Sequence, residues 1–112
     1  MYKLLSITNN KLVSFNGYGL EYKIGEWTYP KFGKLFVFNG LYQAKQWCGY
    51  QNVIYKCEII GEPEKPKFIC NINMCSNNNI KEFWENGSYK VSQKSIPIGT
   101  YLLDAVKITE EV

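Results

Sequence analysis

The sequence has 112 residues, of which 46% are hydrophobic, 16% aromatic and 21% charged. This apolar fraction is too high for a disordered chain, and a domain of this length buries a sizeable core without disulfides or metals. No apolar run approaches the roughly 20 residues that span a bilayer, so we expect no contact with a membrane. No apolar signal core followed by a small-residue cleavage site opens the sequence, which favours a cytoplasmic protein.

The charged residues exclude several classes of site. All 13 basic residues are Lys, Asp104 is the only Asp among the 10 acidic residues, and neither Arg nor His occurs. Without His the chain lacks the commonest general base and metal ligand, and without Arg it lacks the planar fork that grips phosphate. Serine–histidine–aspartate catalysis is therefore impossible within one chain, and we expect a protein that is not an enzyme. The net charge of +3 comes from Lys and Glu interspersed along the sequence, which argues against a nucleic-acid partner.

Four cysteines are spaced too widely for a metal site. Cys48, Cys57, Cys70 and Cys75 form no Cys-x-x-Cys pair, so we expect neither bound metal nor any other cofactor. The strand pattern around Cys57 and the helical spacing before Cys48 predict two small core residues. Cys70 and Cys75 flank an Asn-rich turn, and their role stays open.

Apolar periodicity and turn residues predict strands first, with helices placed between the later strands. We expect strand-like runs at residues 2–7, 12–15, 20–29, 35–38, 53–60, 68–70 and 101–108. Helices are expected at 41–48, with Asn39 as N-cap, and at 79–86, with Gly87 as C-cap. This order predicts one α+β domain over residues 1–112, with a mainly antiparallel or mixed sheet and two short α-helices.

One segment carries a resemblance to a known family. Phe32–Pro63 reads FGKLFVFNGLYQAKQWCGYQNVIYKCEIIGEP: a buried strand, a short helix with an internal Ala, and an amphipathic strand. This pattern resembles the central part of small ADP-ribosyltransferase-like domains, including those of small phage proteins with anti-CRISPR activity. The catalytic Arg or His of that family is absent from the first strand, and neither Asp104 nor Glu110 sits in a matching motif. The resemblance therefore implies the scaffold without the transferase activity.

The segment from Tyr22 to Lys34 is the strongest candidate for a binding site. Its aromatic rings and lysines suit a platform that stacks a base and holds a phosphate, although a hairpin packed on the sheet is the alternative. Asp104 stands among apolar residues, so it either lies in an edge strand or has a role. The predicted ligand-binding residues are Tyr22, Trp27, Tyr29, Lys31, Phe32, Lys34 and Asp104.

These observations predict a non-enzymatic binding protein. The first expectation is a phage anti-defence protein, in the host cytoplasm, that sequesters a cyclic nucleotide or an ADP-ribose-like signalling molecule. The alternatives are a protein inhibitor of a host defence complex, similar to anti-CRISPR proteins, and a divergent ADP-ribosyltransferase. A homo-oligomer is compatible with each of them, because a symmetric interface can share one ligand site.

Overall fold

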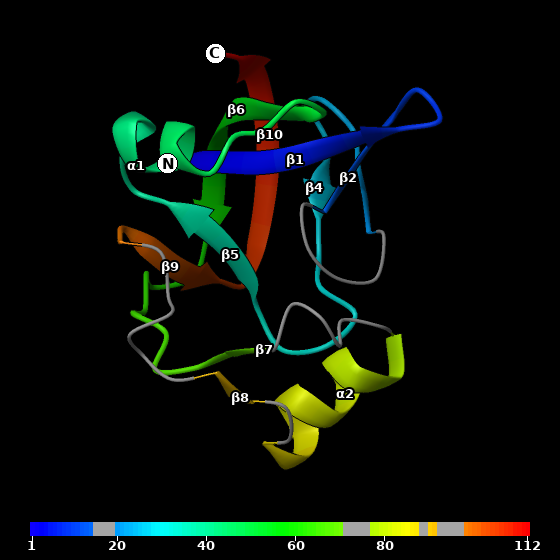
Figure 1. The fold of residues 1–112 in the computed structure, drawn as a ribbon, viewed down its shortest axis with the longest axis vertical. Coiled ribbons are helices and arrows are strands. Elements are labelled where there is room, and N and C mark those ends of the chain that lie inside the picture. Colours follow the sequence, from blue (N-terminus) through cyan, green and yellow to red (C-terminus); the bar gives the residue numbers. More distant parts are fainter. Residues whose placement is uncertain (15–19, 71–76, 88–89, 92–97) are drawn as a thin grey trace.

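The computed structural model describes residues 1–14, 20–70, 77–87, 90–91 and 98–112, which form a mostly antiparallel sheet and two short helices (Figure 1). The strands are β1 (Tyr2–Thr8), β2 (Lys11–Ser14), β3 (Glu21–Tyr22), β4 (Trp27–Thr28), β5 (Leu35–Phe38), β6 (Asn52–Ile60), β7 (Ile69–Cys70), β8 (Lys90–Val91), β9 (Thr100–Leu103) and β10 (Ala105–Glu111). The helices are α1 (Leu41–Gln46) and α2 (Asn77–Asn86).

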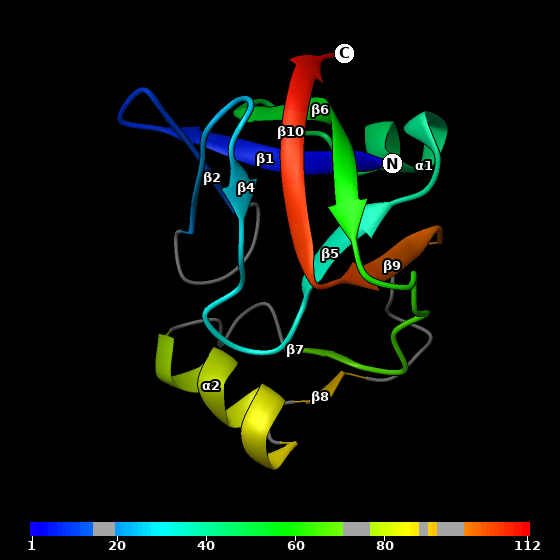
Figure 2. The ribbon, with the colours of Figure 1, turned by 180° about the vertical axis from the view of Figure 1, so that it is seen from behind.

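The large sheet curls until it closes on itself. β1 pairs with β2 on one side and with β6 on the other, and β6 pairs with β10. β5 pairs with β9 and also meets β1, where Tyr2 lies opposite Phe38. Since only Asp104 separates β9 from β10, these pairings lead around the sheet and back to β1 (Figures 1 and 2).

The closed sheet has an inner face and an outer face, and both are covered in part. Leu5, Val37, Leu103, Val106 and Ile108 are almost fully buried in the cluster on the inner face. A second cluster, on the outer face, joins β1, β5 and β6 to the buried Ala44 of α1. Side chains alternate between the faces of a strand, and neighbours in β6 accordingly join different clusters.

Local sequence explains the first hairpin. Asn9 and Asn10 have positive φ of 52° and 62° and connect β1 to β2, with Thr8 opposite Lys11. Asn tolerates this left-handed backbone better than most residues, and a two-residue turn of this kind matches the twist of the flanking strands. The predicted hairpin is confirmed.

Three of the predicted elements differ from the structure, and the first is the run 20–29, which a turn at residues 24 and 25 divides into β3 and β4. α1 ends at Gln46, with Trp47 as its C-cap, and its N-cap is Gly40, whereas the Asn39 side chain makes no capping hydrogen bond. The final run is not one strand, because it bends at Asp104 between β9 and β10. Asp104 lies at this bend with its side chain exposed, so its carboxylate is not buried among the apolar residues on either side of it.

α2 lies at the opposite end of the domain from α1 (Figure 1). Its Trp84 ring packs on Phe36 and against Gly33, where a Cβ atom would overlap the indole. Gly87 adopts φ 71° and its amide donates to the Phe83 carbonyl, as the predicted glycine C-cap requires. β7 and β8 pair with each other in a second, two-stranded antiparallel sheet.

Candidate functional site

The fold separates the residues predicted to form one binding platform. Tyr22 lies in the inner core and is only 2% exposed, with the Lys3 ammonium 5.4 Å from its ring centroid. A ring buried in this way presents no face for stacking a ligand. Residues 24 and 25 form a turn between β3 and β4, so Tyr22 and Trp27 lie on different strands.

Trp27 sits on the outer face of β4, opposite Lys107 of β10. The Lys107 ammonium is 5.2 Å from the Trp27 ring centroid and 2.6 Å from the Glu58 carboxylate of β6. These three side chains therefore form a row across neighbouring strands, with the cation between a ring and an anion. Tyr29 follows β4 and is 60% exposed. We call the surface formed by Trp27 and Tyr29 the Trp27–Tyr29 surface.

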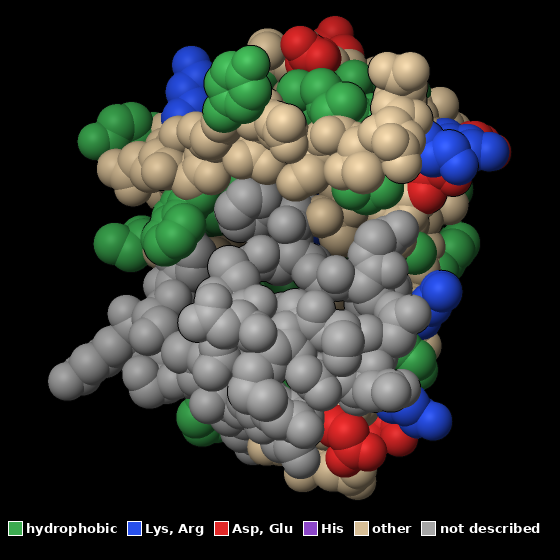
Figure 3. Space-filling model, turned by 45° about the vertical axis from the view of Figure 1, so that its right-hand side comes forward, with side chains coloured by type: hydrophobic (Ala, Val, Ile, Leu, Met, Phe, Trp, Pro, Cys, Tyr) green, Lys and Arg blue, Asp and Glu red, His purple; other side chains and the backbone are tan. Residues whose placement is uncertain are grey.

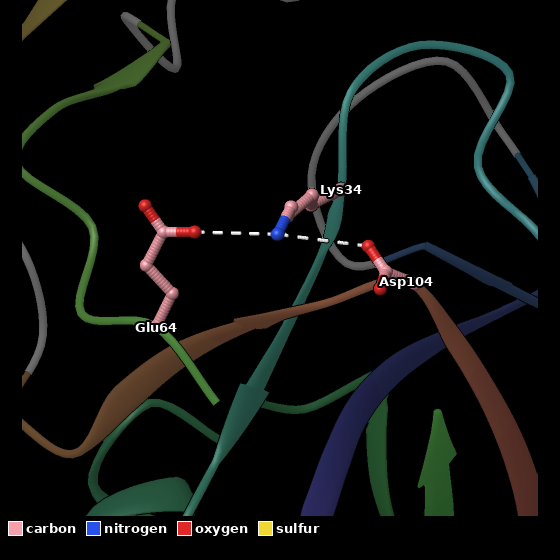
Figure 4. Close-up of polar contacts among 3 residues, drawn as sticks. All are labelled: Lys34, Glu64 and Asp104. Carbon is pink, nitrogen blue, oxygen red and sulfur yellow. Dashed lines mark hydrogen bonds and ion pairs between the residues drawn. The ribbon is translucent and has the colours of Figure 1, made fainter. Parts of the chain in front are cut away.

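Lys34 and Asp104 are the two predicted residues that the structure brings into contact (Figure 4). The Lys34 ammonium lies 3.2 Å from the Glu64 carboxylate and 3.6 Å from that of Asp104. The hydrogen bond to Glu64 contributes most to raising the pKa of Lys34. Backbone hydrogen bonds between Glu64 and Leu102 hold the loop beside β9, so this cluster fastens the loop to the bend at Asp104.

This cluster is poorly suited to phosphate. One ammonium faces two carboxylates, so its net formal charge is −1 if all three groups are ionised, and an anion would meet repulsion there. Lys31 is exposed and Phe32 is partly buried, in the loop that leads from Tyr29 to Lys34. The seven predicted residues thus divide among the core, the Trp27–Tyr29 surface, this loop and the ion cluster.

Lys56 and Glu58 of β6 both form ion pairs with residues of β10. The Lys56 ammonium lies 3.0 Å from the Glu110 carboxylate, and the hydrogen bond between them raises the pKa of Lys56. Lys56, like Lys34 and Lys107, is therefore already engaged by an acidic side chain. On the face shown in Figure 3, blue and red side chains lie beside one another along the right-hand edge.

Lys3 is a buried cation that the sequence did not single out. Its ammonium donates a 2.5 Å hydrogen bond to the Phe36 carbonyl, and the side chain lies among the inner core residues. Desolvation lowers the pKa of Lys3 to about 8. Nearby, burial raises the pKa of Cys57, which packs against the inner core as predicted.

The remaining cysteines give different results. Cys48 is exposed, because α1 ends before it, and the prediction of a core residue was wrong. Cys75 and the Cys70 side chain lie outside the described part of the chain. Among the described residues no three His, Cys, Asp or Glu side chains gather as a metal site would require, and no described helix is long and apolar enough to cross a membrane.

Sequence reasoning missed an aromatic group on and after α1. Tyr42, Trp47 and Tyr50 are exposed by 71%, 47% and 100%. Helical periodicity was the available signal: if Leu41 and Ala44 face the sheet, Tyr42 lies 100° away from Leu41 around the helix and points outward.

Comparisons with known proteins give no family for this chain. Family models, curated proteins and solved structures were each searched, and none of the three searches found a match. Within Phe32–Pro63 the order of elements is strand, helix, strand, as the pattern predicted. The resemblance to ADP-ribosyltransferase-like domains therefore stays a prediction from the residues quoted for it.

Proposed function

We propose that this chain is a non-enzymatic binding protein whose target is another protein, as expected of an inhibitor of a host defence complex. The observation that carries the proposal is the state of the Trp27–Tyr29 surface: aromatic rings are exposed, while the lysine beside Trp27 already contacts a carboxylate. Exposed Trp and Tyr are the side chains most enriched among the residues that dominate protein interfaces.

Charge also favours a protein target over a phosphate-bearing ligand. Lys34, Lys56 and Lys107 each lie within 4 Å of an acidic side chain, so binding a phosphate there would require breaking an existing ion pair. A protein surface, by contrast, can meet a mixture of both charges around an aromatic anchor. The ion pairs between β6 and β10, beside the exposed Trp27 ring, thus suit a protein partner.

Quantitative affinity capture from a bacterial lysate tests this proposal. Wild-type chain is compared with the Trp27→Ser/Tyr29→Ser variant and with Ile7→Ser, which removes an exposed apolar side chain from the first hairpin. We expect one protein to be retained in a near-equimolar amount by wild type and by Ile7→Ser, and to be lost from the double variant. Retention of no protein, or equal retention by all three chains, would overturn the proposal.

A nucleotide-like ligand is the second candidate function. It is favoured by the Lys107 ammonium on the Trp27 ring, because a planar ring with an adjacent cation is also what a base and its phosphate require. Titrating cyclic nucleotides and ADP-ribose while following tryptophan fluorescence tests this candidate. A saturable change in wild type that is absent from Trp27→Phe would support it, and no change at large ligand excess would exclude it.

A further inference from the structure

We infer that the exposed side of α1 and the turn after it bind an acidic segment of a partner protein that also carries apolar side chains. We call this region, defined by Tyr42, Lys45, Trp47 and Tyr50, the 42–50 surface. It is distinct in sequence from the Trp27–Tyr29 surface, and the inference rests on the proposed function only in taking the partner to be a protein.

The aromatic rings of this surface are not needed by the core. Leu41 and Ala44 are the α1 side chains that join the outer cluster, and Ala44 is completely buried. Gln43 is also turned inward, since its side chain lies against Gly40 and Gly99. The residues left on the exposed side include Tyr42 and, at the end of the helix, Trp47, so two large rings face solvent where the fold gains little from them.

The turn that displays Tyr50 is held in one shape by hydrogen bonds at both ends. The Cys48 amide donates to the Lys45 carbonyl, and the Gly49 amide donates to the Asn52 side chain over 2.8 Å. Asn52 in turn donates to the Ser6 hydroxyl over 2.9 Å, which ties the turn to β1. A loop restrained by these hydrogen bonds loses less entropy on binding than an unrestrained loop, and such preorganisation favours recognition.

Charge identifies the kind of partner. Residues 39–57 contain two lysines and no acidic residue. Lys45 is exposed and makes no hydrogen bond or ion pair with any residue that the structure describes, while Lys56 is bonded to Glu110. The neighbouring acidic residue Glu58 is bonded to Lys107. A partner carboxylate would therefore gain an ion pair with Lys45 without facing a carboxylate from this segment.

The same residues favour a protein over a nucleic-acid strand. Tyr and Trp rings each offer an apolar surface together with a hydrogen-bonding group, which suits apolar and polar side chains of a peptide. A nucleic acid is bound chiefly by neutralising several phosphates, and one unpaired lysine supplies little of that attraction. An acidic segment with apolar side chains can pack on the rings and form an ion pair with Lys45.

Selection from a random peptide library on the immobilised wild-type chain tests the inference. We expect the selected peptides to be enriched in Asp and Glu together with aromatic or aliphatic residues, and to bind more weakly as salt is raised. Affinity should fall roughly 30-fold, as for the loss of interface hot spots, in the Tyr42→Ser/Trp47→Ser/Tyr50→Ser variant. Lys45→Glu should weaken binding too, whereas Lys11→Glu on β2 is the matched control and should not.

Several outcomes would overturn the inference. Selected peptides without acidic enrichment, or peptides that bind the triple variant as tightly as wild type, would do so. A thymidine oligonucleotide that binds wild type and not the triple variant would assign the surface to nucleic acid. If peptides lose binding only in Trp27→Ser/Tyr29→Ser, the inference fails while the proposed function stands. Circular dichroism of each variant separates these results from misfolding, and failure to select any peptide counts against the inference.

Discussion

Two segments of this chain, residues 22–34 and 42–50, each combine several aromatic residues with at least one lysine, yet the fold uses them differently. In the first, Tyr22 enters the core, Trp27 is covered in part by Lys107, and Lys34 is bonded to carboxylates. In the second, all three rings and Lys45 stay exposed. Local structure made the difference: Tyr22 of β3 faces the core and Trp27 of β4 faces outward, whereas the short helix α1 and the turn after it leave all three rings outside the core.

The largest expected effect contrasts one ring from each segment. Tyr22→Ala should lower the free energy of unfolding by about 3–5 kcal/mol, because it leaves a cavity in the inner core. Tyr50→Ala removes a fully exposed ring and should change the free energy by less than about 0.5 kcal/mol. Urea denaturation followed by fluorescence measures both. Equal losses would mean that the division between core and surface is wrong.

Two glycines of the segment 22–34 test its turn and its packing against α2. Gly25 has φ 80° with open space around it, so Gly25→Ala should cost only the backbone strain, about 1 kcal/mol. Gly33 has φ 59°, and a Cβ there would overlap the Trp84 ring, so Gly33→Ala should cost roughly 1–3 kcal/mol more. Thermal unfolding of the two variants gives the comparison. A Gly33→Ala protein as stable as Gly25→Ala would contradict the packing of α2 on this segment.

Lys3 gives the core a pH dependence that the exposed lysines lack. Its pKa is about 8 in the folded chain and 10.5 when unfolded, so the unfolded state binds more protons between these values and stability rises with pH. From pH 7 to pH 9 the gain should be about 1 kcal/mol, and it should be missing in Lys3→Met. The raised pKa values of Cys57 and Tyr55 act in the opposite direction at higher pH.

Denaturant unfolding at several pH values measures this difference between wild type and Lys3→Met. At neutral pH, where Lys3 is charged, Lys3→Met should also be at least as stable as wild type, because an apolar side chain of similar size needs no desolvation of charge. Parallel pH profiles for the two chains would show that the ammonium is not buried as described.

The smallest expected effect belongs to the ion cluster. Lys34→Met removes the ion pairs with Glu64 and Asp104. Because all three side chains are substantially exposed, solvent screens the attraction between them. We expect a small fall in melting temperature at low salt that disappears at high salt. A large fall that persists in salt would mean that the loop at Glu64 depends on this cluster far more than its exposure indicates.

Sequence patterns predicted much of the fold, and the errors have physical causes. The first hairpin, the strand Leu35–Phe38 and the glycine cap of α2 followed from turn residues and apolar periodicity. The bend at Asp104 and the early end of α1 depend on tertiary contacts, which local propensity does not contain. Sheet closure was not predictable either, because β1 meets β5 and β6 from distant parts of the chain.

The candidate site was predicted less well than the fold. Contact between Lys34 and Asp104 joins residues far apart in sequence, and nothing local indicates it. The burial of Tyr22 was not predicted, because β3 and β4 are too short for strand alternation to assign which side chains face the core. The outward position of Tyr42 follows from helical spacing, but it was not predicted.

Site-specific photocrosslinking tests the central claim most directly, namely that this chain acts by holding a protein partner against its exposed rings. A benzophenone amino acid replaces Tyr29 or Tyr50 in separate chains, and in a control chain replaces Lys11, which lies on β2. Irradiation in lysate should join a single protein species to the first two positions and none to the third. Equal labelling at all three positions, or labelling at none, would contradict the account.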